Sequence, residues 1–319
     1  HTTFFTREGN VHAVDGVDME IGAGENVGIV GESGCGKSMT AMSVMGLVKK
    51  PGKVDGGKIL FDGMSLTDMR PKERRKILGN QISMIFQEPM TSLNPVTTVG
   101  KQVKEALCPH NKGLSQKEAR EGVVRVFEMV GIPDAAKRYG EYPHQLSGGL
   151  RQRVMIAMAM VCNPKLMIAD EPTTALDVTI EAQILHLMKQ LQEEKGTAVM
   201  MITHNLGVVA QFCTRLYVMY AGKVMESGTV KEIFKNVCHP YTDGLMKSVP
   251  DMESKERLYN IRGMVPSMLH LPKGRRFCPR CQYSGPKCFE EEPKLYEVSP
   301  GHFVRCFLFE QQAAQEGEA

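Results

Sequence analysis

The chain has 319 residues, of which 42% are hydrophobic and 24% are charged, a composition that suits one α/β domain with an additional segment. Its formal net charge of +3 is too small to indicate a nucleic-acid-binding surface, which needs basic residues gathered on one face. No apolar run reaches the roughly 18 residues that span a bilayer, so any membrane contact would come through a partner.

The first residues, His1-Thr-Thr-Phe-Phe, carry neither Met nor a signal-peptide pattern, and we expect a truncated or tag-trimmed end that enters the fold within its first strand. Short apolar runs then predict strands at Val27–Val30, Lys58–Phe61, Ile82–Phe86, Leu166–Ala169 and Ala198–Ile202. Helical spacing predicts helices at Ser38–Val48, Leu150–Cys162 and Thr179–Glu194, and a helical insertion over 101–137.

Two further strands, Tyr217–Tyr220 and Lys223–Glu226, flank Ala221-Gly222 and predict a hairpin. The alternation of continuous apolar strands with helices predicts an α/β fold with a mainly parallel sheet that is covered on both faces. After residue 238 the chain becomes rich in Pro, Gly, Cys and charge without clear periodicity, so we predict a domain boundary there.

The segment Gly31-Glu-Ser-Gly-Cys-Gly-Lys-Ser38 matches the phosphate-binding pattern G-x-x-x-x-G-K-[ST], between a predicted strand and a predicted helix. Its glycines let main-chain N–H groups surround a phosphate chain. Lys37 would neutralise the β- and γ-phosphates, and the Ser38 hydroxyl would bind Mg²⁺. A fortuitous glycine-rich turn is the alternative, but the strand and helix on either side favour a nucleotide site.

A second part of a nucleotide site is predicted where the apolar strand Leu166-Met-Ile-Ala ends in Asp170 and Glu171. Beside a phosphate loop, the first acid can hold Mg²⁺ and the second can orient or deprotonate an attacking water. Two acids after an apolar strand are common in proteins, so this interpretation depends on the loop upstream.

The turn Ser147-Gly148-Gly149 lies at the start of an apolar helix, within Tyr142-Pro-His-Gln-Leu-Ser-Gly-Gly-Leu-Arg-Gln-Arg153, and is a second place suited to an anion. An ordinary helix cap is the alternative. One nucleotide has a single γ-phosphate, so two such turns favour a head-to-tail dimer in which each nucleotide lies between one subunit's loop and the partner's Ser-Gly-Gly.

With these motifs in order, the sequence resembles the nucleotide-binding subunits of ABC transporters, a family of P-loop NTPases with a helical signature subdomain. The resemblance adds a Q-loop at Gln87, a D-loop at Ala175-Leu176-Asp177 and a switch histidine at His204. It implies that Asp170 and Gln87 join Ser38 at Mg²⁺, that Glu171 is the general base, and that His204 contacts the γ-phosphate. The implied nucleotide-binding residues are Gly31, Glu32, Ser33, Gly34, Cys35, Gly36, Lys37, Ser38, Met39, Ser147, Gly148, Gly149 and Asp177.

The segments Ala13–Val17, Gln87–Pro95 and Asp170–Thr179 resemble, more narrowly, the dipeptide/oligopeptide importer ATPases. This resemblance implies a nucleotide-binding domain at 1–237, with the helical subdomain at about 88–162, and an extension at 238–319. It also implies a second ATPase subunit as homo- or heterodimer partner, two permease subunits, an extracytoplasmic solute-binding protein, no nucleic acid, and a peripheral position at the cytoplasmic face of the membrane.

Four of the nine cysteines, Cys278, Cys281, Cys288 and Cys306, gather near the end of the chain. Four thiolates suit Zn²⁺ or an iron–sulfur cluster, and the family resemblance implies a 4Fe–4S cluster. Relatives have Cys within Gly-Cys-Arg-Phe, whereas this chain has Gly274-Arg-Arg-Phe277 and its first cysteine follows at Cys278. We expect a 4Fe–4S cluster, with zinc or free thiols as alternatives, and a tail that takes no part in ATP chemistry.

Several alternatives stay open. The cargo could be nickel or another solute instead of a peptide. A soluble ABC ATPase acting on nucleic acid is disfavoured because the chain holds one cassette without a large insertion, and a small-molecule P-loop kinase has no use for Ser147-Gly-Gly. Spacing puts Glu8 where the family stacks an aromatic ring on adenine, with Phe5 or His12 as substitutes.

Overall fold

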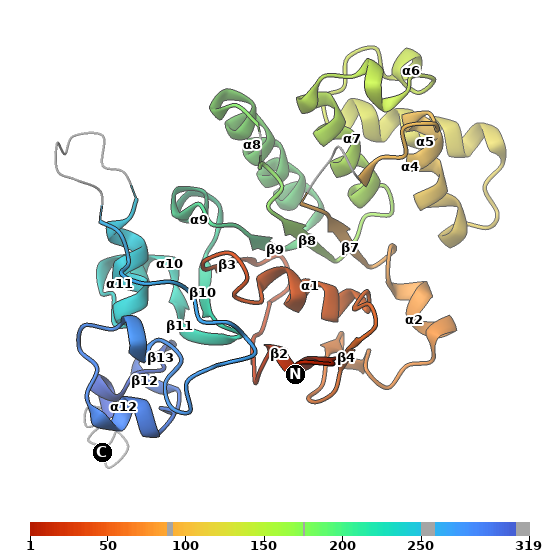
Figure 1. Ribbon diagram of the computed structural model, residues 1–319. Helices are drawn as coiled ribbons and strands as arrows, with labels where there is room; N and C mark the ends of the chain where they lie inside the picture. Colours follow the sequence, from red (N-terminus) through yellow and green to blue (C-terminus); the bar gives the residue numbers. More distant parts are fainter. Residues whose placement is uncertain (88–91, 175, 250–258, 311–319) are drawn as a thin grey trace. The chain divides into compact units, whose positions relative to one another are not determined.

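The computed structural model describes residues 1–87, 92–174, 176–249 and 259–310. It divides the chain into two compact units (Figure 1). Unit 1 consists of His1–Glu20, Val27–Gly57 and Ile202–Ala319, and unit 2 consists of Ile21–Asn26 and Lys58–Met201. Among the described residues, no helix has the length and apolar character needed to cross a membrane.

Unit 1 contains two groups of strands. The first is an antiparallel sheet with the strand order β2-β1-β4. Its strands are β2 (Gly9–Val14), β1 (Thr2–Thr6) and β4 (Gly52–Val54). The second group has the order β12-β13-β11-β10-β3, with bounds Tyr296–Ser299, His302–Val304, Lys223–Thr229, Arg215–Tyr220 and Asn26–Val30. The helices of this unit are α1 (Lys37–Met45), α9 (Leu206–Phe212), α10 (Val230–Lys235), α11 (Pro240–Lys247) and α12 (Pro286–Glu290).

Strand β3 is the core strand of unit 1 because every one of its residues is buried. It pairs in parallel with β10, and Leu216 lies opposite Gly28. A side chain on Gly28 would come within 3.1 Å of Val209 in α9, so the missing side chain lets that helix pack closely on the strand. The predicted hairpin is confirmed, since β10 and β11 are antiparallel and Tyr220 pairs with Lys223.

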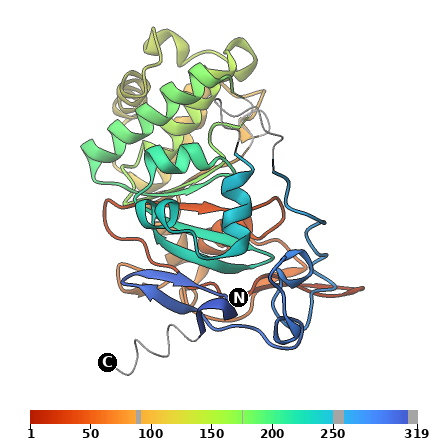
Figure 2. The same cartoon turned by 90° about the vertical axis from the view of Figure 1, so that its left-hand side faces the viewer.

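The tail joins this sheet through two short antiparallel strands. Strand β13 pairs with β11 through Glu226–Val304 and Ser227–Phe303, and β12 pairs with β13 (Figure 2). Two 3-10 turns, η3 (Cys278–Arg280) and η4 (Phe307–Phe309), complete the tail. Residues on both sides of position 238 therefore belong to one compact unit.

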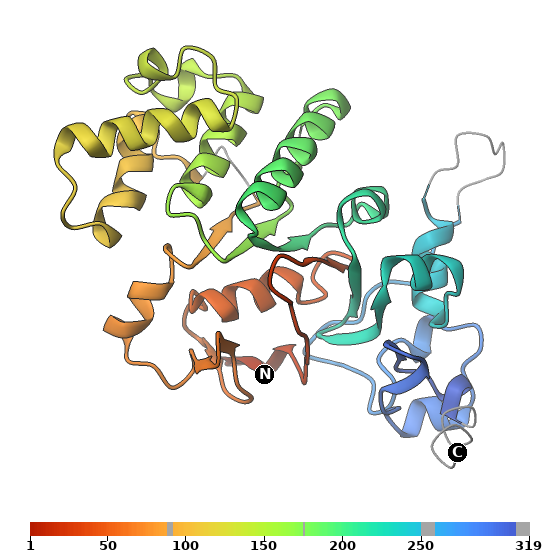
Figure 3. The same cartoon turned by 180° about the vertical axis from the view of Figure 1, so that it is seen from behind.

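Unit 2 contains the strand order β9-β8-β7, with bounds Ala198–Ile202, Leu166–Asp170 and Ile82–Ile85, and a small hairpin of β5 (Leu60–Phe61) and β6 (Met64–Ser65). Its helices are α2 (Pro71–Ile77), α4 (Val99–Leu107), α5 (Gln116–Met129), α6 (Ala135–Arg138), α7 (Gly148–Met160) and α8 (Val178–Lys195). Two 3-10 turns lie at η1 (Cys108–His110) and η2 (Pro143–Gln145). Helices α4, α5 and α7 gather into one helical group (Figure 3).

Three features differ from the predictions. The sheet is mixed, because β11 pairs antiparallel with β10 and with β13, and β12 pairs antiparallel with β13. The strand predicted at Lys58–Phe61 is reduced to two residues, and the tail contains α11 and a strand pair where no periodicity was visible. Short strands in the tail alternate too briefly to give a pattern, and their pairing with β11 supplies the order instead.

Candidate functional site

The phosphate-binding loop follows β3 directly and leads into α1, as the motif predicts. Gly31 has φ 151°, and a side chain there would lie 2.1 Å from the carbonyl oxygen of Met219 in β10. Gly36 has φ 103°, and its side chain would lie 2.4 Å from the carbonyl oxygen of Ala13. Both positions therefore require glycine, because a side chain at either would collide with a main-chain carbonyl oxygen.

The Lys37 side chain turns back over this loop and is 6% exposed. Its Nζ donates to the carbonyl oxygens of Gly31 at 2.7 Å and Glu32 at 3.0 Å. A bound triphosphate would exchange these acceptors for phosphate oxygens, because an ammonium group prefers charged acceptors. Burial is the main cause that raises the pKa of the Cys35 thiol in the same loop, so this cysteine stays protonated. Ser38 and Met39 follow in the first turn of α1.

Tail residues hold the outer side of the loop, and none of them was identified from the sequence. Arg280 forms a two-pronged ion pair with Glu32, with Nη1 to Oε2 at 2.6 Å and Nη2 to Oε1 at 3.0 Å. The Tyr241 hydroxyl accepts the Glu32 N–H at 2.8 Å. The tail therefore contacts the nucleotide loop directly. That the tail takes no part in ATP chemistry stays a prediction.

Arg276 gives the tail a second attachment. Its guanidinium donates to the carbonyl oxygen of Ala221 and to the Asp15 carboxylate. Burial alone would raise the pKa of Asp15, but Arg276 and Lys223 together hold it below its ordinary value. The tail is thus joined to the hairpin turn after β10 as well as to the loop.

His204 lies in unit 1, exposed, between β9 and α9. Thr203 donates its N–H to the carbonyl oxygen of Ile29 at 3.1 Å, which places the histidine turn beside the end of β3. His204 therefore shares a sheet edge with the phosphate loop. Of the two substitutes for adenine stacking, Phe5 is 48% exposed, and His12 is bonded through Nδ1 to the Thr3 hydroxyl at 2.9 Å; both stay candidates.

Unit 2 brings Gln87 and Glu171 together. Glu171 follows the buried Asp170 at the end of β8, and its Oε2 accepts from Gln87 Nε2 at 3.0 Å and from the Thr174 hydroxyl at 3.0 Å. Its φ of 47° lies in the left-handed region, which non-glycine residues adopt uncommonly. The carboxylate is thereby held at the carboxyl end of the strand beside an amide that can also orient water.

The Ser147-Gly148-Gly149 turn caps α7, with the Ser147 hydroxyl accepting the Leu150 N–H at 3.4 Å. Asp177 caps α8 in the same way through Ile180 at 3.0 Å. A side chain on Gly149 would lie 3.1 Å from Ile180, so the starts of α7 and α8 lie side by side. The first-turn N–H groups of both helices therefore lie close together. Ala175 of the predicted D-loop and residues 88–91 of the Q-loop segment lie outside the described residues.

The four tail cysteines Cys278, Cys281, Cys288 and Cys306 are all buried free thiols in unit 1. Arg275 is 2% exposed, and its Nη1 lies 3.8 Å from the Cys281 sulfur. Its Nη2 lies 2.9 Å from His239 Nε2, its guanidinium lies 6.0 Å from the centre of the Phe277 ring, and its Nε has no hydrogen-bond partner. A buried cation beside the Cys281 sulfur is compatible with an anionic group at this place, since a buried charge needs an opposite one.

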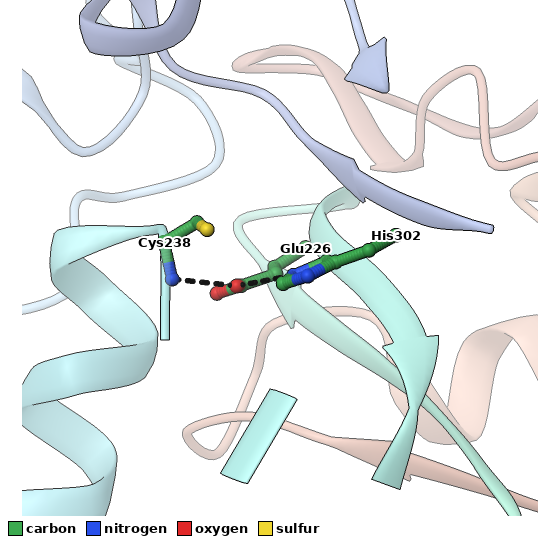
Figure 4. A group of neighbouring side chains, drawn as sticks. All are labelled: Glu226, Cys238 and His302. Carbon is green, nitrogen blue, oxygen red and sulfur yellow. Dashed lines mark hydrogen bonds and ion pairs between the residues drawn. The ribbon is translucent and has the colours of Figure 1, made fainter. Parts of the chain in front are cut away.

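A second group of metal-ligating side chains, Glu226, Cys238 and His302, has its ligand atoms within 4.8 Å of one another (Figure 4). The Glu226 carboxylate already accepts N–H groups of Cys238 at 2.8 Å and His239 at 3.0 Å, and His302 Nε2 lies 2.8 Å away. This network ties β13 and the start of α11 to β11. Its acceptors are used within the protein, so we interpret it as structural.

Comparisons with known proteins agree with this geometry. The model of the ABC transporter family matches residues 14–174, and the model of the oligopeptide/dipeptide transporter C-terminal region matches residues 225–288. The oligopeptide transport ATP-binding protein AppD of Bacillus subtilis is 50% identical over 99% of this chain and 96% of its own length. The dipeptide transport ATP-binding protein DppD of Lactococcus lactis is 48% identical over 98% of this chain and 90% of its own.

Solved structures resemble the fold. The dimeric structure of MJ0796, a bacterial ABC transporter cassette, has a TM-score of 0.64 at 32% identity, covering 72% of this chain and 95% of that one. The dimeric post-hydrolysis state of the same cassette, with ADP and Pi, has a TM-score of 0.65 at 31% identity with the same coverage. The aligned share leaves more than a quarter of the present chain without a counterpart in those cassettes.

Proposed function

The chain belongs to the ATP-binding subunits of ABC transporters, and on that premise we propose that it hydrolyses ATP to drive the import of dipeptides and oligopeptides. The observation that carries the chemistry is the hydrogen bond between Gln87 and the left-handed Glu171 at the end of β8. The C-terminal match and the names of the relatives support the peptide cargo.

In this mechanism the loop N–H groups and Lys37 hold the phosphates, and Ser38, Asp170 and Gln87 are the residues that would hold Mg²⁺. When bound, the metal would offset the negative charge of the phosphates. Glu171 accepts a proton from the attacking water, which the Gln87 amide orients. His204 binds the γ-phosphate from the same sheet edge as the loop.

We further propose that two such subunits close head to tail, so that Ser147, Gly148, Gly149 and Asp177 of one subunit meet the nucleotide of the other. The second subunit is a copy of this chain or a related ATPase. The ATPase would lie at the cytoplasmic face of the membrane and act on two membrane permease subunits. A solute-binding protein would deliver the peptide to them. Residues 1–237 would form the nucleotide-binding domain, with its helical subdomain at about 88–162, and 238–319 the extension.

Co-expression with its permease subunits and solute-binding protein, followed by uptake of a labelled tripeptide into right-side-out vesicles loaded with ATP, tests the cargo. We expect uptake that depends on ATP on the cytoplasmic side and disappears with Glu171→Gln. Uptake of nickel but of no peptide would contradict the peptide assignment, and an ATPase that copurifies with nucleic acid and no permease would contradict transport.

The tail cysteines are proposed to hold a 4Fe–4S cluster, which would supply order to a segment with few apolar residues. The buried Arg275 beside the Cys281 sulfur supports an anionic group at this place. Anaerobically purified protein should absorb broadly near about 400 nm and contain about four irons per chain. Stoichiometric zinc without iron would reject the cluster. If the protein contained neither iron nor zinc, the thiols would be free.

A further inference from the structure

Glu32 is the one acidic residue inside the phosphate-binding loop Gly31–Ser38. Its main-chain carbonyl accepts Lys37 Nζ at 3.0 Å, so the residue lies at the lysine that binds phosphate. Burial is the main cause that raises the pKa of the Cys35 thiol in the middle of the loop, and the negative charge of Glu32 raises it further. A carboxylate in this position repels a triphosphate unless a cation offsets it.

Arg280 is that cation. Its side chain is 4% exposed, and the fork of its two terminal nitrogens matches both Glu32 carboxylate oxygens. This geometry makes the pair stronger and more directional than an exposed ion pair. The Arg280 Nε donates to the carbonyl oxygen of Arg262 at 2.9 Å, so the guanidinium has a fixed orientation.

The aromatic residues behind Arg280 fix its position further. The guanidinium lies 5.8 Å from the ring centre of Tyr220 and 5.9 Å from that of Phe277. Tyr241, whose hydroxyl accepts the Glu32 N–H, packs against both rings at 4.7 Å and 5.3 Å. The tail therefore presents a rigid cation to the loop, held by the η3 turn that begins at Cys278.

We propose that Arg280 is a positioning residue of the nucleotide site, which offsets the Glu32 charge and thereby sets the affinity of the loop for nucleotide. The proposal rests on the proposed ATP-binding function and goes beyond it, because it assigns a role in nucleotide affinity to the C-terminal tail. It also predicts that the tail and the loop cannot be changed independently.

Calorimetric titration of the full-length chain with Mg·ADP tests this proposal. Arg280→Ala should weaken binding about tenfold, because an uncompensated carboxylate then faces the phosphates. Glu32→Gln alone should bind at least as tightly as the wild type. The double variant with both changes should return to within about threefold of the wild type, since the repulsion is gone.

The matched control is Lys287→Ala, which removes another tail cation paired with a carboxylate, Glu310 at 2.6 Å, away from the loop. It should leave nucleotide affinity unchanged. If Arg280→Ala does not fold, Arg280→Lys and Arg280→Gln can be compared instead. Arg280→Lys should keep the nucleotide affinity, and Arg280→Gln should lose it.

A wild-type chain that binds no nucleotide would overturn the proposed function itself. With normal wild-type binding, two results would overturn the role of Arg280. One is an Arg280→Ala variant that binds as tightly as the wild type. The other is weak binding that Glu32→Gln does not restore, which would mean that Arg280 acts only by holding the tail in shape.

Discussion

The phosphate-binding loop in unit 1 and the carboxylate of Glu171 in unit 2, the proposed general base, are held in different ways. Glu171 is oriented by Gln87 and by Thr174, a neighbour three residues away, and both partners belong to motifs that the sequence displays. The loop is held by residues far along the chain, with Glu32 and Arg280 separated by 248 positions. The proposed catalytic carboxylate is therefore oriented by motif residues, one 84 and one three positions away, whereas the loop is also held by the tail.

The largest expected effect is at the carboxylate. Glu171→Gln should reduce ATP hydrolysis about a hundredfold or more while ATP binding persists, because the general base is lost and the phosphate loop is untouched. Steady-state phosphate release measures the loss. Glu193→Gln, an exposed position of α8, is the control and should keep normal turnover. Near-normal hydrolysis in Glu171→Gln would reject Glu171 as the base.

The second prediction concerns the anion-binding turn of unit 2. Ser147→Arg on the Glu171→Gln background should abolish ATP-driven dimerisation in size-exclusion chromatography, while the monomer still binds nucleotide through its own loop. Ser115→Arg is a matched control, since Ser115 caps α5 in the same way at an exposed site. Each change loses a helix cap that contributes about 1 kcal/mol, but only the first should prevent dimers. A dimer that survives Ser147→Arg would contradict the head-to-tail arrangement.

A smaller effect sharpens the contrast between the regions. Cys278 and Cys281 flank Arg280 in the η3 turn, and the Cys278 carbonyl accepts the Ser284 hydroxyl at 2.7 Å. Replacing both cysteines by serine should weaken Mg·ADP binding severalfold by displacing Arg280. Cys108→Ser, a half-buried thiol of unit 2, should have no effect on affinity. Unchanged affinity in the double serine variant would mean that the turn keeps Arg280 in place without its thiols.

The smallest expected effect is a pH dependence of stability in the tail. Burial first, and then the nearby Arg275 charge, lower the pKa of the fully buried His239 well below its usual 6.5. The unfolded chain then binds a proton that the folded chain does not, so stability should fall as pH drops below about 6.5, by up to about 1.4 kcal/mol per pH unit.

Urea unfolding at pH 7 and pH 5.5 measures this loss. His239→Asn keeps a side chain able to cap α11 and should reduce the difference in unfolding free energy between the two pH values by about 1 kcal/mol. His186→Asn, at an exposed site of α8, should leave the difference unchanged. An equal loss in the wild type and in His239→Asn would show that other groups carry the pH dependence.

These two regions also show how far the sequence could be interpreted. The strands Ile82–Ile85 and Leu166–Asp170 are continuous apolar runs, so their positions were predicted within one residue. The motif glycines predicted the loop because a close approach leaves no other choice at Gly31 and Gly36. Arg280 could not be identified from the sequence, because a single arginine between two cysteines resembles an ordinary surface residue. Its role depends on the pairing of β13 with β11, which attaches the tail to the sheet of unit 1.

The dependence of ATP hydrolysis on ATP concentration in Arg280→Ala tests most directly whether affinity and catalysis are held by different regions. Glu171 and its partners lie in unit 2 and are unchanged in this variant. We predict that KM rises about tenfold with kcat close to that of the wild type, because only binding is weakened. A fall in kcat with an unchanged KM would contradict the account, since it would place Arg280 in the chemical step.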